Sequence, residues 1–453
     1  MYPGSGIFIS PQGVLLRSGS VAMSLLVWLL CGVISLLGAL CYCELGTVIP
    51  MSGGEYAYYL KALGPLGRWG NVAAFLYVWA TVMLTKPAAL AIMVLTFARY
   101  LAEPFLGGGC DDHTGSYSIT LLALLCLLTI AVINCVSVKW ATKMQNIFTI
   151  AKLLAIGLVV FGGLIHTCLG NGLPITINFE GPPVSFSQIA TACYFGLWAY
   201  EGCSNRDVGC YRNSANYITE ELINPYVTLP RALWIGIPLV TLCYIVTNIA
   251  YLAAMTSSEL LATQVVAVKF AARVLGPVSA VIPLFVAASA YGAGNANTFC
   301  TGRLVFVAGR EGHMPEAFSY VNVKRLTPLV AIIFNTFLCA VMILLGNINS
   351  LIDFFSFTAW IFYGGAMALV IVLRFTMKDT PRPYKVPLVI PVLMVLICIF
   401  LVVTPIVQNP TMGYVYALIF IFSGMLFYIP FVHLKKKLPI MGEFHKSYTH
   451  KTE

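Results

Sequence analysis

An acidic residue within an apolar stretch is the first feature of this sequence that could do chemistry. Glu201 lies in Gly196-Leu197-Trp198-Ala199-Tyr200-Glu201-Gly202, where a helix would be crossing a bilayer. A charged side chain there costs at least about 2.5–3.5 kcal/mol, so such residues are usually functional. The glycines on either side predict an interruption of the helix at residues 196–202, which would leave backbone groups facing a cavity.

A second interruption is predicted at the start of the chain, in Gly4-Ser5-Gly6-Ile7-Phe8 followed by Pro11. Two glycines around a serine, with the helix resuming after them, expose backbone N–H groups at a helix N-terminus, which suits a carboxylate. Taken alone, glycine in a membrane helix can equally be a notch for close packing. Two interruptions about five spans apart are typical of the binding site of inverted-repeat transporters.

The sequence offers little for catalysis. It has six histidines, of which His166 approaches an apolar run, and it has no HExxH, CxxC or nucleotide-binding loop. Intramembrane catalysis would need paired acids or a Ser/His dyad at one depth, and we find neither. We therefore expect no enzyme activity, no metal site and no cofactor.

The composition indicates what must position these residues. Of the 453 residues, 59% are apolar and 9% are charged, whereas about 25% of a soluble protein is charged. A helix needs about 20 apolar residues to cross the hydrocarbon core, and the sequence contains eleven such runs. They lie at residues 20–42, 69–101, 117–137, 145–166, 186–201, 231–255, 278–308, 329–346, 351–375, 387–407 and 412–433. We expect one all-α membrane domain, residues 1–433, and a tail, residues 434–453.

The basic residues are divided unevenly between alternate loops. Twenty Lys and Arg residues fall in one set of loops and in the C-terminal tail, whereas four (Arg17, Arg99, Lys269 and Arg273) fall in the other set. Because cytoplasmic loops collect Lys and Arg, we expect the first set and the C-terminus in the cytoplasm. The net charge of +9 thus reflects membrane topology and does not indicate a nucleic-acid partner.

Longer motifs extend along nearly the whole chain. They are Gly4 to Pro11, Glu44-Leu45-Gly46-Thr47-Val48-Ile49-Pro50-Met51-Ser52-Gly53-Gly54-Glu55-Tyr56, Asn216 to Leu222, Gly302-Arg303 with Ala308 to Met314, and Arg382-Pro383 to Val386-Pro387. With these motifs the chain resembles the amino acid–polyamine–organocation transporters. Within that superfamily it is similar to the light chains of heteromeric amino acid transporters, and most of all to their b-zero-plus type.

The resemblance implies both a fold and a function. The fold is a five-plus-five inverted repeat of the twelve-span type, with the first half-helix missing because the chain opens directly on a motif. The function is sodium-independent exchange, at the plasma membrane, of cystine and cationic amino acids (arginine, lysine and ornithine) for neutral amino acids.

The resemblance also implies a substrate site. Trp198 matches the aromatic residue that closes over the substrate, although it could instead face lipid. Glu201 stands where the b-zero-plus type has an acid and relatives for neutral substrates have a small residue, so it would pair with a cationic side chain. Backbone N–H groups of the unwound first segment would bind the substrate carboxylate. Backbone carbonyls of that segment, and others near Trp198 and Glu201, would bind the α-amino group. That segment consists of Tyr2, Pro3, Gly4, Ser5 and Gly6.

Two further residues take roles from the resemblance. Lys152 stands near the position of sodium in related sodium-driven transporters, so it implies sodium independence; a lysine that snorkels to the interface is the alternative. Cys110 matches the light-chain cysteine that bonds to a glycosylated, single-span heavy chain, and an internal bridge to Cys168 is its alternative. The chain itself has no Asn-x-Ser/Thr sequon, as expected if the heavy chain carries the glycans.

One segment departs from the family pattern. Residues 203–211 look like an insertion of nine residues after Gly202, and they include Arg206 and Asp207. Because the insertion lies beside the expected site, it keeps open the alternative of a membrane subunit that does not transport. A separate alternative is an exchanger for neutral amino acids only, against which Glu201 argues.

Overall fold

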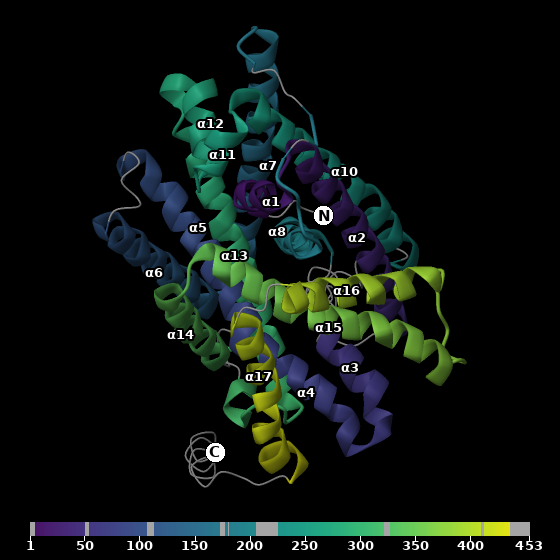
Figure 1. Ribbon diagram of the computed structural model, residues 1–453. Helices are drawn as coiled ribbons and strands as arrows, with labels where there is room; N and C mark the ends of the chain where they lie inside the picture. The colour runs from purple at the N-terminus through teal and green to yellow at the C-terminus, as the bar shows by residue number, and fades with distance from the viewer. Residues whose placement is uncertain are drawn as a thin grey trace.

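The chain folds into a bundle of helices (Figure 1). The computed structural model describes residues 5–49, 54–106, 113–172, 177–179, 181–204, 225–320, 327–408 and 412–434. No strand occurs in these ranges. Apolar spans form helices because a helix satisfies all its backbone hydrogen bonds within one segment, where lipid offers no partners. The predicted tail beyond residue 434 lies outside the described residues, so its separation from the membrane domain stays a prediction.

Each of the eleven predicted spans is helical. Within the described residues, eight of these spans are long and apolar enough to cross a membrane. They are α2 (Val21–Val48), α4 (Asn71–Ala80) continued by a π-helix (Thr81–Thr85) and α5 (Lys86–Leu106), α6 (His113–Val136), α7 (Val138–Cys168), α10 (Pro225–Ala254), α15 (Ile348–Thr376), α16 (Val389–Gln408) and α17 (Met412–Phe427) with the π-helix Tyr428–His433. The three remaining spans are α8 (Phe186–Ser204), α13 (Val281–Arg310) and α14 (Leu329–Leu345).

Local signals explain where several helices begin and end. Ser20 Oγ accepts a hydrogen bond from the N–H of Met23 at 3.3 Å before α2, and Ser137 Oγ accepts one from the N–H of Trp140 at 3.4 Å before α7. These are N-caps, which satisfy N–H groups that the first turn leaves without a partner. Gly19 ends α1 (Ser10–Ser18) with a φ of 72°, a left-handed conformation that favours glycine.

The contacts between helices follow a five-plus-five repeat. Counting from α1, the first five units are α1, α2, α4–α5, α6 and α7, and the second five are α8, α10, α13, α14 and α15. Corresponding members touch in four of the five pairs: α1 with α8, α2 with α10, α5 with α13, and α6 with α14. This pairing is what an inverted repeat produces, and it places α1 against α8.

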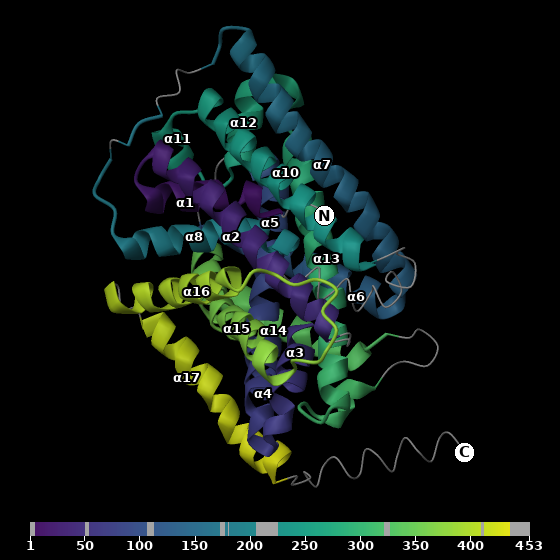
Figure 2. The same cartoon turned by 90° about the vertical axis from the view of Figure 1, so that its right-hand side faces the viewer.

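Short helices lie at opposite ends of the bundle (Figure 2). The helices α11 (Ser257–Leu261) and α12 (Val266–Val274) lie at one end, and α3 (Glu55–Leu63) and the end of α17 lie toward the other. Arg273 and Glu259 join α12 to α11 through a 2.9 Å ion pair, and this guanidinium lowers the pKa of Glu259 to about 2. The helix α12, which carries Lys269 and Arg273, predicted to be exterior, thus lies toward the opposite end of the bundle from α3, which carries Lys61, predicted to be cytoplasmic.

Candidate substrate site

The two segments that the sequence singled out lie against each other. A 3₁₀ helix, η1 (Ser5–Phe8), precedes α1 and packs on α8. A Cβ atom added to Gly6 would lie 2.5 Å from Cα of Ala199, so only glycine allows this approach. Ala199 immediately follows Trp198. The backbone of the first segment therefore touches α8 where its predicted site residues stand.

The first segment is not a regular α-helix in its described part. The 3₁₀ turn is followed by Ile9, whose N–H donates to the carbonyl of Gly6 at 2.9 Å, and α1 begins at Ser10 with Pro11 in its first turn. The hydroxyl of Tyr100 on α5 donates to the carbonyl of Phe8 at 2.6 Å. In a continuous helix, this carbonyl would accept a hydrogen bond from a backbone N–H of the helix; here the hydroxyl of Tyr100 is its donor. Of the predicted carboxylate-binding residues, Ser5 and Gly6 belong to this turn, whereas Tyr2, Pro3 and Gly4 lie outside the described residues.

The interruption predicted at residues 196–202 is wrong. The helix α8 continues through these residues to Ser204. Gly196 instead permits close packing, because a Cβ atom there would lie 2.6 Å from Sγ of Cys31 on α2. A glycine in a membrane helix has the same local signal whether it breaks the helix or lets a neighbour approach. The predicted insertion, which continues past Ser204, lies mostly outside the described residues.

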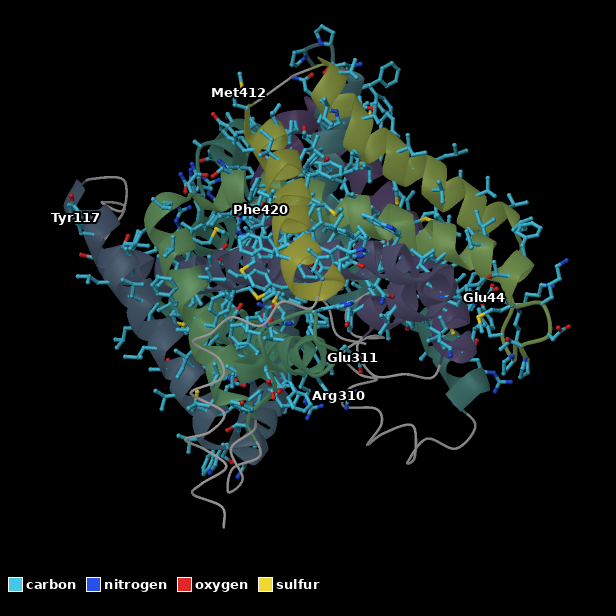
Figure 3. All side chains as sticks on the ribbon, turned by 90° about the horizontal axis from the view of Figure 1, so that it is seen from below. Glu44, Tyr117, Arg310, Glu311, Met412 and Phe420 are labelled. Carbon is cyan, nitrogen blue, oxygen red and sulfur yellow. The ribbon has the colours of Figure 1, made fainter. Side chains whose placement is uncertain are left out.

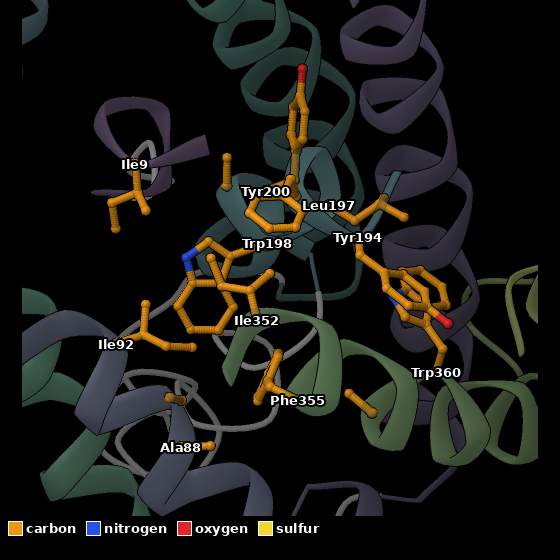
Figure 4. Close-up of a cluster of buried hydrophobic side chains, with 14 of the residues drawn as sticks. Ile9, Ala88, Ile92, Tyr194, Leu197, Trp198, Tyr200, Ile352, Phe355 and Trp360 are labelled. Carbon is orange, nitrogen blue, oxygen red and sulfur yellow. The ribbon is translucent and has the colours of Figure 1, made fainter. Parts of the chain in front are cut away.

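Trp198 is buried within the protein, with 6% of its surface exposed. Its ring lies 4.8 Å from that of Phe355 on α15, centroid to centroid, at an interplanar angle of 83°. Figure 4 shows Ile9, Ile92 and Ile352 around the same indole. Trp198 thus stands where α5, α8 and α15 meet the junction between η1 and α1, and it does not face lipid.

Glu201 lies one turn further along α8, where Tyr363 of α15 donates a hydrogen bond to its Oε1. The ring of Tyr363 packs edge-on against Trp360 at 5.3 Å and against Tyr42 of α2 at 6.4 Å. Nothing in the sequence pointed to Tyr363, because an aromatic residue in an apolar run carries no signal for a site. Arg206 and Arg212, other conceivable partners of Glu201, lie outside the described residues.

Lys152 is buried, with 8% of its surface exposed, near the middle of α7. Its neighbours Leu153 and Leu154 are about half exposed, so the lysine points away from the outward face of that helix. One turn earlier, Phe148 contacts α13, since a Cβ atom added to Gly292 would lie 2.5 Å from Cβ of Phe148. Lys152 therefore belongs to the side of α7 that packs inside the bundle rather than to its lipid-facing side.

An ion pair near Trp198 links α1 to α15, and a ring of α8 packs against it. Arg17 of α1 lies 3.0 Å from Asp353 of α15, and its guanidinium carbon lies 4.1 Å from the ring centroid of Phe195 on α8. Phe195 precedes Trp198 by three residues on α8, and Asp353 precedes Phe355 by two residues on α15. Together with Arg17 they join α1, α8 and α15 beside Trp198. In the sequence Arg17 counted only as a loop charge, because its partner is 336 residues away.

A second charged cluster lies where α2 meets the segment between α15 and α16 (Figure 3). Glu44 accepts hydrogen bonds from Arg374 Nε at 2.9 Å, from Arg374 Nη2 at 2.5 Å and from Arg382 Nη1 at 3.2 Å. The N–H of Val386 donates to it at 2.8 Å. We call these four residues the Glu44 cluster. In the described part of the chain, no three His, Cys, Asp or Glu side chains could hold a metal ion.

Comparisons with known proteins agree with this architecture. Residues 1–431 match the amino acid permease family. The chain is 48% identical to the b(0,+)-type amino acid transporter 1 of Homo sapiens over 432 residues, 95% of this chain and 85% of that protein. It is 38% identical to the large neutral amino acids transporter small subunit 2 of Mus musculus over 98% of this chain and 81% of that protein. It is 40% identical to the cystine/glutamate transporter of Homo sapiens over 90% of this chain and 78% of that protein. The chain belongs to the amino acid permease family and is a multi-pass membrane transporter, not an enzyme.

Proposed function

We propose that this protein is a sodium-independent exchanger of cationic amino acids and cystine for neutral amino acids across the plasma membrane. The observation that carries this proposal is Glu201, which stands one turn from the buried Trp198, on the helix that η1 touches. The relatives of this chain that are named b(0,+)-type amino acid transporters support the proposed exchange of cationic amino acids and cystine. The relative named for large neutral amino acids marks the main alternative.

The proposed site assigns each part of the substrate to one element. Backbone N–H groups of residues 2–6 bind the α-carboxylate, as N–H groups at the start of a helix do for anions. The indole of Trp198 covers the aliphatic part of the side chain. Glu201 receives the side-chain cation, and a charge-assisted hydrogen bond of this kind contributes roughly 1.5–3 kcal/mol. A neutral side chain leaves Glu201 hydrogen-bonded to Tyr363.

Proteoliposomes that contain the full chain test this function. Vesicles loaded with leucine should take up external arginine, and vesicles loaded with buffer alone should not, because an exchanger needs a substrate on both sides. Exchange of leucine without arginine would support the alternative for neutral amino acids. Absence of both activities would support a membrane subunit that does not transport.

Lys152 supplies a fixed positive charge in the proposed mechanism. Arginine uptake should therefore be unchanged when choline replaces sodium, and a several-fold loss in choline would contradict the assignment. Lys152→Ala should strongly lower turnover at near-normal surface expression. Lys152→Arg, which keeps the charge, is the matched control and should retain more activity than the alanine variant.

The proposed partner is a glycosylated heavy chain with a single span, bonded to Cys110 outside the cell. Cys110 lies outside the described residues, but the words "small subunit" in one relative's name support a larger partner. A non-reducing gel should show a heavy band that reductant removes, and Cys110→Ser should abolish it. If the band survives that change but disappears in Cys168→Ser, the exposed Cys168 at the end of α7 is the partner cysteine.

The orientation in the plasma membrane is part of the proposal. Its basis is the concentration of Lys and Arg in one set of loops and in the tail. An epitope tag at the C-terminus should be labelled by antibody only after the cells are permeabilised.

A further inference from the structure

A second carboxylate is connected to Glu201 through two tyrosines. Glu55, the first residue of α3, is 9% exposed, and the hydroxyl of Tyr42 on α2 donates to its Oε1 at 2.5 Å. The ring of Tyr42 meets the ring of Tyr363 edge-on at 6.4 Å, and Tyr363 in turn donates to Glu201. The two acids thus end a continuous series of contacts through α8, α15, α2 and α3.

This series of contacts has a direction. Tyr42 lies near the end of α2, which stops at Val48, and α3 follows. The helix α3 carries Lys61, one of the basic residues that predict a cytoplasmic loop. Glu55 therefore lies between Glu201 and the predicted cytoplasmic end of the bundle.

The side chains along this series suit a cation. The ring of Tyr42 also lies 6.4 Å from that of Tyr58, so three tyrosine rings accompany the two carboxylates. Aromatic faces attract ammonium and guanidinium groups, and more strongly once these are desolvated. A cationic side chain that leaves Glu201 would otherwise lose its charge partner inside the protein, at a high desolvation cost. A leucine side chain has no such cost.

The histidine beside α3, His313, adds no positive charge that would compete with a substrate cation for Glu55. Next to Glu55 along α3, the hydroxyl of Tyr56 lies 3.0 Å from Nδ1 of His313. Burial lowers the pKa of His313, which follows the end of α13, to about 4. The imidazole is therefore neutral at cytoplasmic pH.

We propose that Glu55 is a second binding point for the side-chain cation of dibasic amino acids, between Glu201 and the cytoplasm, and that it speeds their release. This inference rests on the proposed exchange of cationic amino acids. The competing explanation is structural: through Tyr42, Glu55 would only tie α3 to α2.

Glu55→Gln separates the two explanations, because it removes the charge and keeps an oxygen that accepts from Tyr42. Release to the cytoplasmic side is measured as the maximal rate at which external labelled arginine, or external labelled leucine, enters right-side-out proteoliposomes loaded with leucine; we call these rates arginine exit and leucine exit from the site. Arginine exit should fall by about tenfold, which corresponds to one lost charge-assisted hydrogen bond. The exit of leucine should change by less than about twofold, since a neutral side chain does not use this bond. The KM for external arginine should stay near its wild-type value.

Two further variants guard against a general folding defect. Tyr42→Phe removes the tie to Glu55 but leaves its charge, so arginine exit should fall much less than in Glu55→Gln. Glu55→Asp keeps the charge on a shorter side chain and should also retain arginine exit. Equal losses of arginine and leucine exit in all three variants would overturn the proposal. Absence of arginine exchange in the wild-type protein would instead overturn the proposed function, and the role of Glu55 with it.

Discussion

Glu44 and Glu201 are both glutamates on membrane helices, but their surroundings differ. Glu44 is 1% exposed, and two arginines and a backbone N–H donate to it. Glu201 accepts from the phenol of Tyr363. A phenol satisfies an oxygen atom of the carboxylate without neutralising it, whereas two guanidiniums over-compensate a single negative charge.

This difference fits the proposed roles, in which Glu44 serves the fold and Glu201 the substrate. Arg374 and Arg382 also donate to carbonyls of Val386, Leu373 and Met377, so the Glu44 cluster fastens the segment after α15 to α2. A carboxylate held by so many fixed donors has little capacity for a ligand. A neutral hydroxyl such as that of Tyr363 can give way to a substrate cation without leaving a second charge behind. In the proposed assignment, the donors observed at the two glutamates distinguish their roles better than burial does.

The largest effect is expected at Glu44, and it would sharpen this contrast. Glu44→Gln leaves two guanidiniums without their buried counter-charge, and breaking a buried ion pair in this way costs about 3–5 kcal/mol. Surface expression should fall strongly, and the remaining protein should carry arginine and leucine in the wild-type ratio. Surface biotinylation together with uptake of both amino acids measures this.

A change in selectivity between arginine and leucine in Glu44→Gln would contradict the contrast drawn between Glu44 and Glu201. A shifted arginine-to-leucine ratio at normal expression would mean that a fully paired acid can still act on the substrate. Arg382→Gln is the milder companion, because Glu44 keeps Arg374. It should lower expression less than Glu44→Gln does.

A smaller effect is expected at Tyr363. Tyr363→Phe removes one hydrogen bond to Glu201, and a typical bond contributes about 0.5–1.5 kcal/mol, or roughly a two- to tenfold change. Arginine affinity should fall within this range because the carboxylate loses the group that orients it, whereas leucine affinity should stay unchanged. Concentration dependence of uptake for both substrates provides the check. A loss as large for leucine as for arginine would show that Tyr363 serves packing.

The sequence predicted the spans well because hydrophobic length is a local property. All eleven apolar runs are helices, and Gly6 does lie in an irregular turn. The interruption at 196–202 was wrong because Gly196 fits against Cys31, a contact between residues 165 positions apart that no local pattern reveals. Tyr363 and the arginines of the Glu44 cluster were missed for the same reason. Their roles come from partners on other helices.

The most direct test of the central claim is Glu201→Gln, with arginine and leucine exchange measured on the same membranes and corrected for surface expression. The variant loses the charge but keeps an oxygen for Tyr363. Arginine should weaken by about ten- to a hundredfold, the equivalent of one charge-assisted hydrogen bond, and leucine should change little or improve. Equal losses for arginine and leucine would contradict the account, because they would make Glu201 a structural tie rather than the residue that selects cations.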